Sequence, residues 1–228
     1  MTEAELRARL ARPRPPPPDP HGAPGVSPAT VPPEVVPPPG AIAAPARSDD
    51  ALDLVSPPLI PAAVLVPIIF GPDPGILLTK RTAHLNAHAG QVSFPGGRID
   101  PLDRSPEDAA LREAWEEIGL DPETVELAGR LASYVTGTGY EITPVLGLLG
   151  PSPSLMPSAD EVEAMFELPL SVLLDPHAPQ RRRAHYRGRW REFWVWPHPE
   201  HYIWGATAGI LMHLAAVLRG PETGGPRS

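Results

Sequence analysis

Proline is concentrated in the first quarter of this chain. Of the 35 prolines among 228 residues, 17 lie in residues 1–61, and no Phe, Tyr or Trp precedes Phe70. A segment with so much proline and no aromatic side chain cannot bury enough apolar surface to offset the entropy that it loses on folding. The sequence therefore predicts a disordered N-terminal tail over residues 1–60, a folded domain over 61–219 and a flexible C-terminal tail over 220–228.

Composition and charge exclude several classes of protein. The chain has no cysteine, so it is not a disulfide-stapled secreted scaffold. It has no apolar run near the 18 or so residues of a membrane span, and no secretory signal at its start, so we expect a cytoplasmic protein with no membrane partner. The formal net charge of −8 argues against a nucleic-acid partner. The sequence leaves the oligomeric state open, a homodimer included.

Hydrophobic patterning from residue 61 onward indicates strands mixed with a few helices. Apolar or alternating runs predict strands over 62–70, 76–81, 91–94, 127–136, 142–149 and 189–196. Helical spacing predicts helices over 105–118, 161–166 and 207–218. This order indicates an α+β domain with helices packed on a mixed β-sheet.

The helix predicted over 105–118 has well-defined ends. Ser105 is a good N-cap, Pro106 suits the first helical position, and Gly119 is placed to end the helix. The spacing i, i+3, i+4 and i+7 predicts one core-facing stripe, made of Leu111, Ala114, Trp115 and Ile118.

Three carboxylates gather on another part of this helix. Glu113, Glu116 and Glu117 lie at i, i+3 and i+4 in the last two turns. Like charges at this spacing repel by about 0.2–0.5 kcal/mol per pair, and the helix dipole disfavours negative charge at this end. A divalent cation such as Mg²⁺ or Mn²⁺ would reverse the sign of both effects. On spacing alone, a solvated acidic face is an equally good interpretation.

The residues around these glutamates resemble the Nudix box. Gly97, Asp103 and the run Arg112-Glu113-Ala114-Trp115-Glu116-Glu117-Ile118-Gly119-Leu120 carry the resemblance. Asp103 stands where the family has Glu, and eight residues instead of seven separate it from Arg112, which puts the role of Asp103 in doubt. The resemblance implies an α/β/α sandwich with a catalytic strand-loop-helix-loop. It also implies a hydrolase of phosphorus-containing anhydrides that acts on a small-molecule substrate.

A second pattern resembles the coenzyme A pyrophosphatase branch of the Nudix hydrolases. It runs from Leu77-Leu78-Thr79-Lys80-Arg81 to Phe94-Pro95-Gly96-Gly97, with Gly90 at the expected spacing; Thr82 and Asn86 depart from it. The resemblance implies hydrolysis of coenzyme A to 4′-phosphopantetheine and adenosine 3′,5′-bisphosphate. Other substrates left open are ADP-ribose, NADH and a nucleoside triphosphate, and a non-catalytic nucleotide-binding scaffold is a further alternative.

The same resemblance suggests roles for individual residues. Glu113 and Glu117 would hold Mg²⁺ or Mn²⁺ with the help of Glu116, and Arg112 would orient these carboxylates. The general base that activates water would be Glu116 or Glu161, although Glu161 can also be read as the start of a helix.

Substrate contacts are predicted upstream of the acidic helix. Arg81 would meet a phosphate, although an exposed arginine at a strand end is equally ordinary. Gln91, Phe94 and Gly97 would line the substrate site, with Phe94 also suited to the core. Six arginines between 181 and 191 suggest either a contact with the 3′-phosphate of coenzyme A or a solvated hairpin.

Overall fold

The computed structural model describes residues 1–11, 57–83, 90–186 and 189–220. Within these residues, one sheet of eight strands forms the centre of the molecule and a second sheet of three strands lies apart from it. The large sheet contains β1 (Ile60–Ile69), β2 (Gly75–Arg81), β3 (Val92–Ser93), β4 (Gly96–Arg98), β5 (Glu126–Arg130), β6 (Tyr134–Val135), β7 (Tyr140–Leu149) and β8 (Val162–Pro169). The small sheet contains β9 (Gln180–Tyr186), β10 (Arg189–Trp196) and β11 (Ile203–Trp204).

The large sheet is mixed, as the sequence predicts. Its two longest strands, β1 and β7, run parallel in register from Ile60 opposite Tyr140 to Ile69 opposite Leu149. The other pairings are antiparallel, with β2 between β8 on one side and β1 and β3 on the other.

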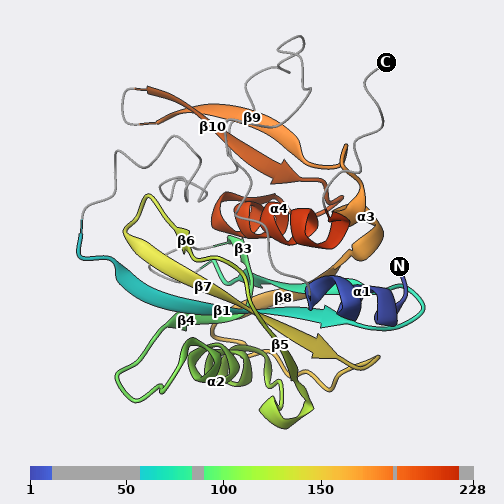
Figure 1. The fold of residues 1–228 in the computed structure, drawn as a ribbon. Coiled ribbons are helices and arrows are strands. Elements are labelled where there is room, and N and C mark those ends of the chain that lie inside the picture. The colour runs from blue at the N-terminus through green and yellow to red at the C-terminus, as the bar shows by residue number, and fades with distance from the viewer. Residues whose placement is uncertain (12–56, 84–89, 187–188, 221–228) are drawn as a thin grey trace, which may run out of the picture.

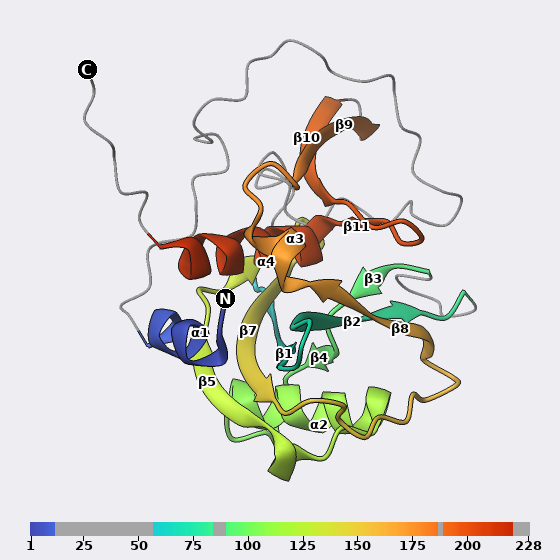
Figure 2. The same ribbon diagram turned by 90° about the vertical axis from the view of Figure 1, so that its right-hand side faces the viewer.

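Helices cover both faces of this sheet, which confirms the α+β sandwich. Helix α2 (Pro106–Ile118) lies against one face (Figure 1). Helix α4 (Gly205–Arg219) lies across the other face, beneath β9 and β10, with α3 (Leu170–Leu174) beside it (Figures 1 and 2). Each face has its own apolar core, so two hydrophobic layers hold the sandwich together.

The first residues of the chain are folded, contrary to the tail predicted from residue 1. Helix α1 (Glu3–Leu10) begins with a capping box between Thr2 and Glu5, and Leu6 and Leu10 are buried in the same core as α4. Ile60, at the end of the predicted tail, already begins β1, whereas residues 12–56 and 221–228 lie outside the described residues.

Two further expectations are wrong for reasons of packing. Residues 161–166, predicted as a helix, are the turn residue Glu161 and the first part of β8, where pairing with β2 along seven positions overrides the local pattern. Ala114 and Ile118 of the predicted core-facing stripe are buried, but Trp115 is exposed, because the buried face of α2 is centred on Ala110, Ala114 and Ile118.

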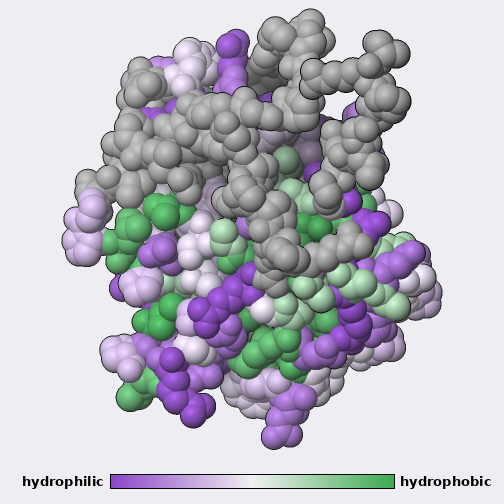
Figure 3. All heavy atoms as spheres, in the orientation of Figure 1, coloured by the Kyte–Doolittle hydropathy of each residue, from purple (hydrophilic) through white to green (hydrophobic). Residues whose placement is uncertain are grey.

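The remaining elements match with shifted ends. The strand predicted over 127–136 is divided into β5 and β6, both paired with β7. The strands predicted near 62–70, 76–81, 91–94, 142–149 and 189–196 are present, as is the closing helix α4. Among the described helices, none combines the length and apolar character that crossing a lipid bilayer requires. On the face shown in Figure 3, hydrophilic and hydrophobic residues are interspersed over the described surface.

Candidate active site

The candidate site lies where α2 approaches β4 and the end of β2. Gly97 on β4 faces Glu113 of α2 so closely that a Cβ on Gly97 would lie 2.6 Å from the Glu113 carboxyl carbon. Gly96 has a φ of +155° and no room for a Cβ, which would lie 2.4 Å from the backbone oxygen of Ala63. Gly97 therefore allows the acidic helix to approach β4, whereas Gly96 allows β4 to lie close to β1.

Glu117 is the most buried carboxylate of the site. Its side chain is only 3% exposed; Oε1 accepts a hydrogen bond from Nη1 of Arg81 at 3.1 Å, and Oε2 accepts one from the Gly96 amide at 3.3 Å. Burial raises the pKa of Glu117 to about 7, although the Arg81 charge and the Gly96 amide oppose the shift. Such a carboxyl is readily deprotonated when a cation arrives, because metal binding displaces protons from its ligands.

Glu113 and Glu116 share Arg112. Nη1 of Arg112 donates to Glu113 at 2.9 Å and to Glu116 at 3.1 Å. Burial raises the pKa of Glu113, with the Arg112 contact opposing the shift, whereas the Glu116 side chain is half exposed. Arg112 therefore lies between the two carboxylates, as the expected orienting role requires.

Asp103, whose role the sequence put in doubt, is the main partner of Arg112. Its two carboxylate oxygens accept from Nε and Nη2 of Arg112 at 3.1 and 2.9 Å. This hydrogen-bonded contact holds the pKa of Asp103 below its usual range. In the turn that precedes α2, the Asp103 amide donates to the Asp100 carbonyl at 3.0 Å, and the Asp100 amide donates to the Asp103 carboxylate at 2.8 Å. Asp103 therefore pairs with Arg112 despite the extra residue between them.

Arg81, Gln91 and Glu161 come together on neighbouring segments. The Arg81 amide donates to the Gln91 carbonyl at 2.9 Å, and the next amide, that of Thr82, donates to the Glu161 carbonyl at 3.0 Å. The charge of Glu161 contributes to the raised pKa of both Glu113 and Glu117, so Glu161 belongs to the same electrostatic environment. Its backbone lies in the turn before β8, close to the end of α2, where the Ser158 amide donates to the Glu117 carbonyl at 2.8 Å.

Phe94 does not join these residues. Its side chain is 2% exposed and packs in the core on the α4 face, so the expectation that it lines a substrate entrance is corrected in favour of the core. The remaining predicted residues, namely Arg81, Gln91, Gly97, Arg112, Glu113, Glu116, Glu117 and Glu161, lie around the contact between α2, β4 and the end of β2.

Sequence reasoning missed two contributors to the site. The Gly96 amide donates to Glu117, and the Arg98 carbonyl accepts from Nη2 of Arg112 at 3.2 Å. Both are backbone groups of β4, and a main-chain atom leaves no side-chain signal in a sequence. The glycine pair next to Pro95 was the available hint, since it predicts a close approach of the backbone.

The donor chemistry of the site suits a hard divalent cation. Glu113, Glu116 and Glu117 offer carboxylate oxygens, the ligands that Mg²⁺ and Mn²⁺ prefer. Within the described ranges, however, no three acidic, histidine or cysteine side chains surround a common point as a metal would require. The arginine contacts explain this, because Glu117 is turned toward Arg81 while Glu113 and Glu116 are turned toward Arg112.

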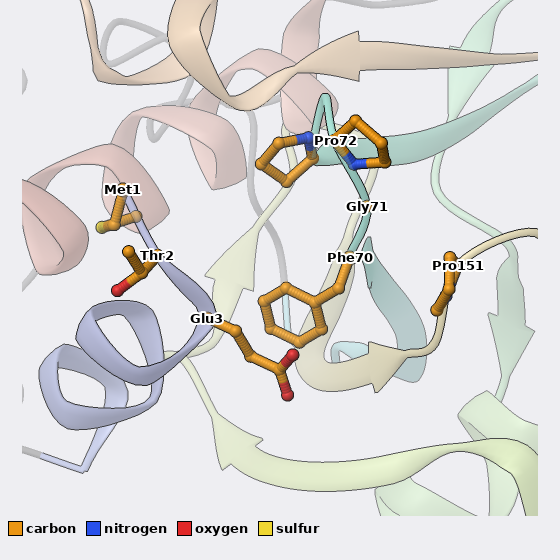
Figure 4. Close-up of a pocket in the computed structure, with 8 residues that line it drawn as sticks. Met1, Thr2, Glu3, Phe70, Gly71, Pro72 and Pro151 are labelled. Carbon is orange, nitrogen blue, oxygen red and sulfur yellow. The ribbon is translucent and has the colours of Figure 1, made fainter.

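A separate pocket of about 340 Å³ lies far from these carboxylates in the fold. It is formed by the beginning of α1, the turn between β1 and β2, and Pro151 (Figure 4). Its lining is Met1, Thr2, Glu3, Phe70, Gly71, Pro72, Pro74 and Pro151. None of the predicted site residues lines it, so the candidate active site is assigned from the carboxylate geometry instead.

Comparison with known proteins places the chain in a family that the fold also fits. The NUDIX domain family model matches residues 59–187. A protein of Escherichia coli strain SMS-3-5 named "Uncharacterized Nudix hydrolase NudL" is 46% identical over 154 residues, which cover 68% of this chain and 80% of that protein. A protein of the same name from Cronobacter sakazakii has the same identity and coverage.

A solved Nudix hydrolase, RenU of M. smegmatis, is 23% identical and superposes with a TM-score of 0.42 over 49% of this chain and 71% of its own. The extent of the family match and the identity to the two named relatives place the chain in a family: it belongs to the Nudix hydrolases. It is thus a hydrolase of phosphorus-containing anhydrides, from a family that generally uses divalent metal ions.

Proposed function

We propose that this Nudix hydrolase cleaves the pyrophosphate bond of coenzyme A or its derivatives with Mg²⁺ or Mn²⁺. The products would be 4′-phosphopantetheine, or its acyl form, and adenosine 3′,5′-bisphosphate. The observation that carries the proposal is the contact of Arg81 with Glu117 at 3.1 Å. Arg81 belongs to the segment 77–97 that resembles the coenzyme A branch, and Glu117 belongs to the Nudix box. The contact therefore joins the two motifs at one site.

The chain's own residues supply the positions that such a hydrolysis needs. Water attacks one phosphorus, the bridging P–O bond breaks, and the two phosphates leave on separate products while the proton of the water passes to a general base. The divalent ion, when bound, polarises the phosphoryl oxygens and lowers the pKa of the attacking water. Glu113 and Glu117, with Glu116, would hold that ion.

The general base is Glu161 or Glu116. Glu161 lies in a turn outside the helix and contributes to the raised pKa of both Glu113 and Glu117, which supports a role close to the glutamates that would hold the ion. Glu116 is half exposed but already engaged by Arg112. These contacts favour Glu161 as the base and Glu116 as a metal ligand.

Arg112 is a positioning residue in this scheme. All five donor positions of its guanidinium are used, on Asp103, Glu113, Glu116 and the Arg98 carbonyl. It therefore has no donor left for a phosphate and acts by holding the carboxylates in place.

A substrate panel tests the proposal. Coenzyme A, acetyl-coenzyme A, ADP-ribose, NADH and a deoxynucleoside triphosphate would each be incubated with the full chain and Mg²⁺ or Mn²⁺, and the products would be identified by mass spectrometry. We expect kcat/KM for coenzyme A or its acetyl form to exceed that for the other substrates by at least about tenfold. Cleavage of ADP-ribose or NADH while coenzyme A stays intact would overturn the proposed specificity and leave the hydrolase class unchanged.

A further inference from the structure

We infer that Arg81 and the divalent ion bind the Glu117 carboxylate one after the other. In this inference the guanidinium of Arg81 holds the buried Glu117 carboxylate until the ion binds, and is then transferred to a phosphate of the substrate. The displacement of Arg81 from Glu117 involves only these two residues and the ion. The transfer of Arg81 to a phosphate rests on the proposed substrate.

Glu117 is placed so that two cations compete for it. Its side chain is 3% exposed, and its two oxygens face Arg81 at 3.1 Å and the Gly96 amide at 3.3 Å. An ion on this carboxylate would lie within a few ångströms of the guanidinium. Two cations so close in a poorly hydrated site repel strongly and are screened little by salt. Binding of the ion therefore favours release of Arg81.

Only the side chain of Arg81 has to move when it leaves Glu117, because hydrogen bonds to the segments on both sides hold the Arg81 backbone in place. The Arg81 amide donates to the Gln91 carbonyl at 2.9 Å and its carbonyl accepts from the Gly90 amide at 3.1 Å. Arg81 also pairs with Val162 of β8. A released guanidinium thus stays at the mouth of the site, tethered by a side chain that is already 25% exposed.

The two arginines of the site differ in how many of their side-chain donors are hydrogen-bonded to the protein. Arg112 uses all five of its donor positions on the protein, as described above. Within the part of the chain that the structure describes, the Arg81 side chain donates to Glu117 through Nη1 alone. The rest of its planar fork suits the bidentate recognition of a phosphate. Arg81 is therefore the arginine that can change partners.

The test compares Arg81→Gln with the neighbouring Lys80→Gln. Both remove one positive charge from β2, but Lys80 pairs with Glu163 at 2.6 Å and makes no contact with Glu117 in the described structure. Affinity for Mn²⁺ alone, without substrate, would be measured by titration calorimetry or by electron paramagnetic resonance of the free ion. We expect Arg81→Gln to bind Mn²⁺ at least about fivefold more tightly than the unaltered chain, and Lys80→Gln to change it less than twofold.

The second measurement is the KM of the substrate. We expect Arg81→Gln to raise KM at least about tenfold for whichever phosphoanhydride the panel identifies, since a phosphate loses its arginine. Tighter Mn²⁺ binding together with a higher KM in Arg81→Gln supports the proposed replacement of Arg81 by the ion at Glu117. Unchanged or weaker Mn²⁺ binding in Arg81→Gln overturns it, as does an equal gain in Lys80→Gln, which would indicate a general charge effect.

Two controls keep these outcomes distinct. The metal titration needs no substrate, so it tests the exchange even if coenzyme A proves not to be cleaved. If Arg81→Gln does not fold, as judged by circular dichroism, Arg81→Lys retains the charge without the planar fork. That variant should bind Mn²⁺ within about twofold of the unaltered chain and still raise KM. A normal KM in Arg81→Lys would overturn the transfer of a planar guanidinium to phosphate.

Discussion

Truncation of Leu6 to alanine tests whether helix α1 is part of the folded domain. An isolated helix of eight residues is not stable in water, so α1 owes its structure to docking. Leu6 is 0% exposed and Leu10 4% exposed, both in the core that contains α4. Removing a buried leucine side chain to Cβ costs about 2–5 kcal/mol in the free energy of unfolding. With a urea m-value of about 2 kcal/mol/M, a loss of 3 kcal/mol lowers the denaturation midpoint by about 1.5 M.

The assay is urea denaturation of the full chain, followed by tryptophan fluorescence, with Leu102→Ala as the matched control. Leu102 is 94% exposed, so the same chemical change there should alter stability by no more than about 0.5 kcal/mol. Equal midpoints for Leu6→Ala and the unaltered chain, or equal shifts for Leu6→Ala and Leu102→Ala, would refute the docking of α1. A shift confined to Leu6→Ala would also predict that deletion of α1 lowers the stability of the domain.

Three shorter predictions concern the site. Gly97→Ala should lower kcat/KM by about tenfold or more, because its Cβ would lie 2.6 Å from the Glu113 carboxyl group, whereas Gly150→Ala, with no atom within 4 Å of its Cβ, should match the unaltered enzyme in the same assay. Glu117→Gln should lower kcat about a hundredfold if Glu117 holds the ion, and turnover equal to that of the exposed control Glu123→Gln would contradict this role. Asp103→Asn should lose about 1.5–3 kcal/mol of unfolding free energy at pH 7. Because the Arg112 contact holds the pKa of Asp103 below its usual range, this stabilisation is present above about pH 4 and is lost as the pH falls through the lowered value. The denaturation midpoints of the two chains should therefore converge as the solution becomes more acidic, and a constant difference would exclude the ion pair as its source.

Much of the sheet and α2 could be predicted because their signals are local. Ser105, Pro106 and Gly119 mark both ends of α2, and the cap observed at Ser105 accepts from the Asp108 amide at 3.2 Å. The helix predicted over 161–166 is wrong because so short a stretch fits both the helical and the strand periodicity, and only its pairing with β2 makes it a strand. The Trp115 error has a related cause. Four apolar positions fit one stripe, but the face that α2 buries is centred on Ala110, Ala114 and Ile118, so Trp115 lies outside it.

The site was predictable as far as residue types at fixed spacing define it. Glu113, Glu116 and Glu117 follow from helical spacing and the Nudix pattern. The contact of Arg81 with Glu117 joins residues 36 positions apart, and the sequence contains no signal for that distance. Asp103 shows the opposite limit: a departure from the pattern in both residue and spacing put its role in doubt, although the structure pairs it with Arg112.

The packing of α1 against α4 has a consequence for synthesis of the chain. Leu6 and Leu10 leave the ribosome early, but part of the core that buries them lies on α4, which ends at Arg219. At about 5–20 residues per second, roughly 10–40 s separate the emergence of the two helices. Throughout that interval, α1 has no complete site to dock on. Helix α1 is therefore among the last of the described elements to reach its final environment, although it precedes all the others in the sequence.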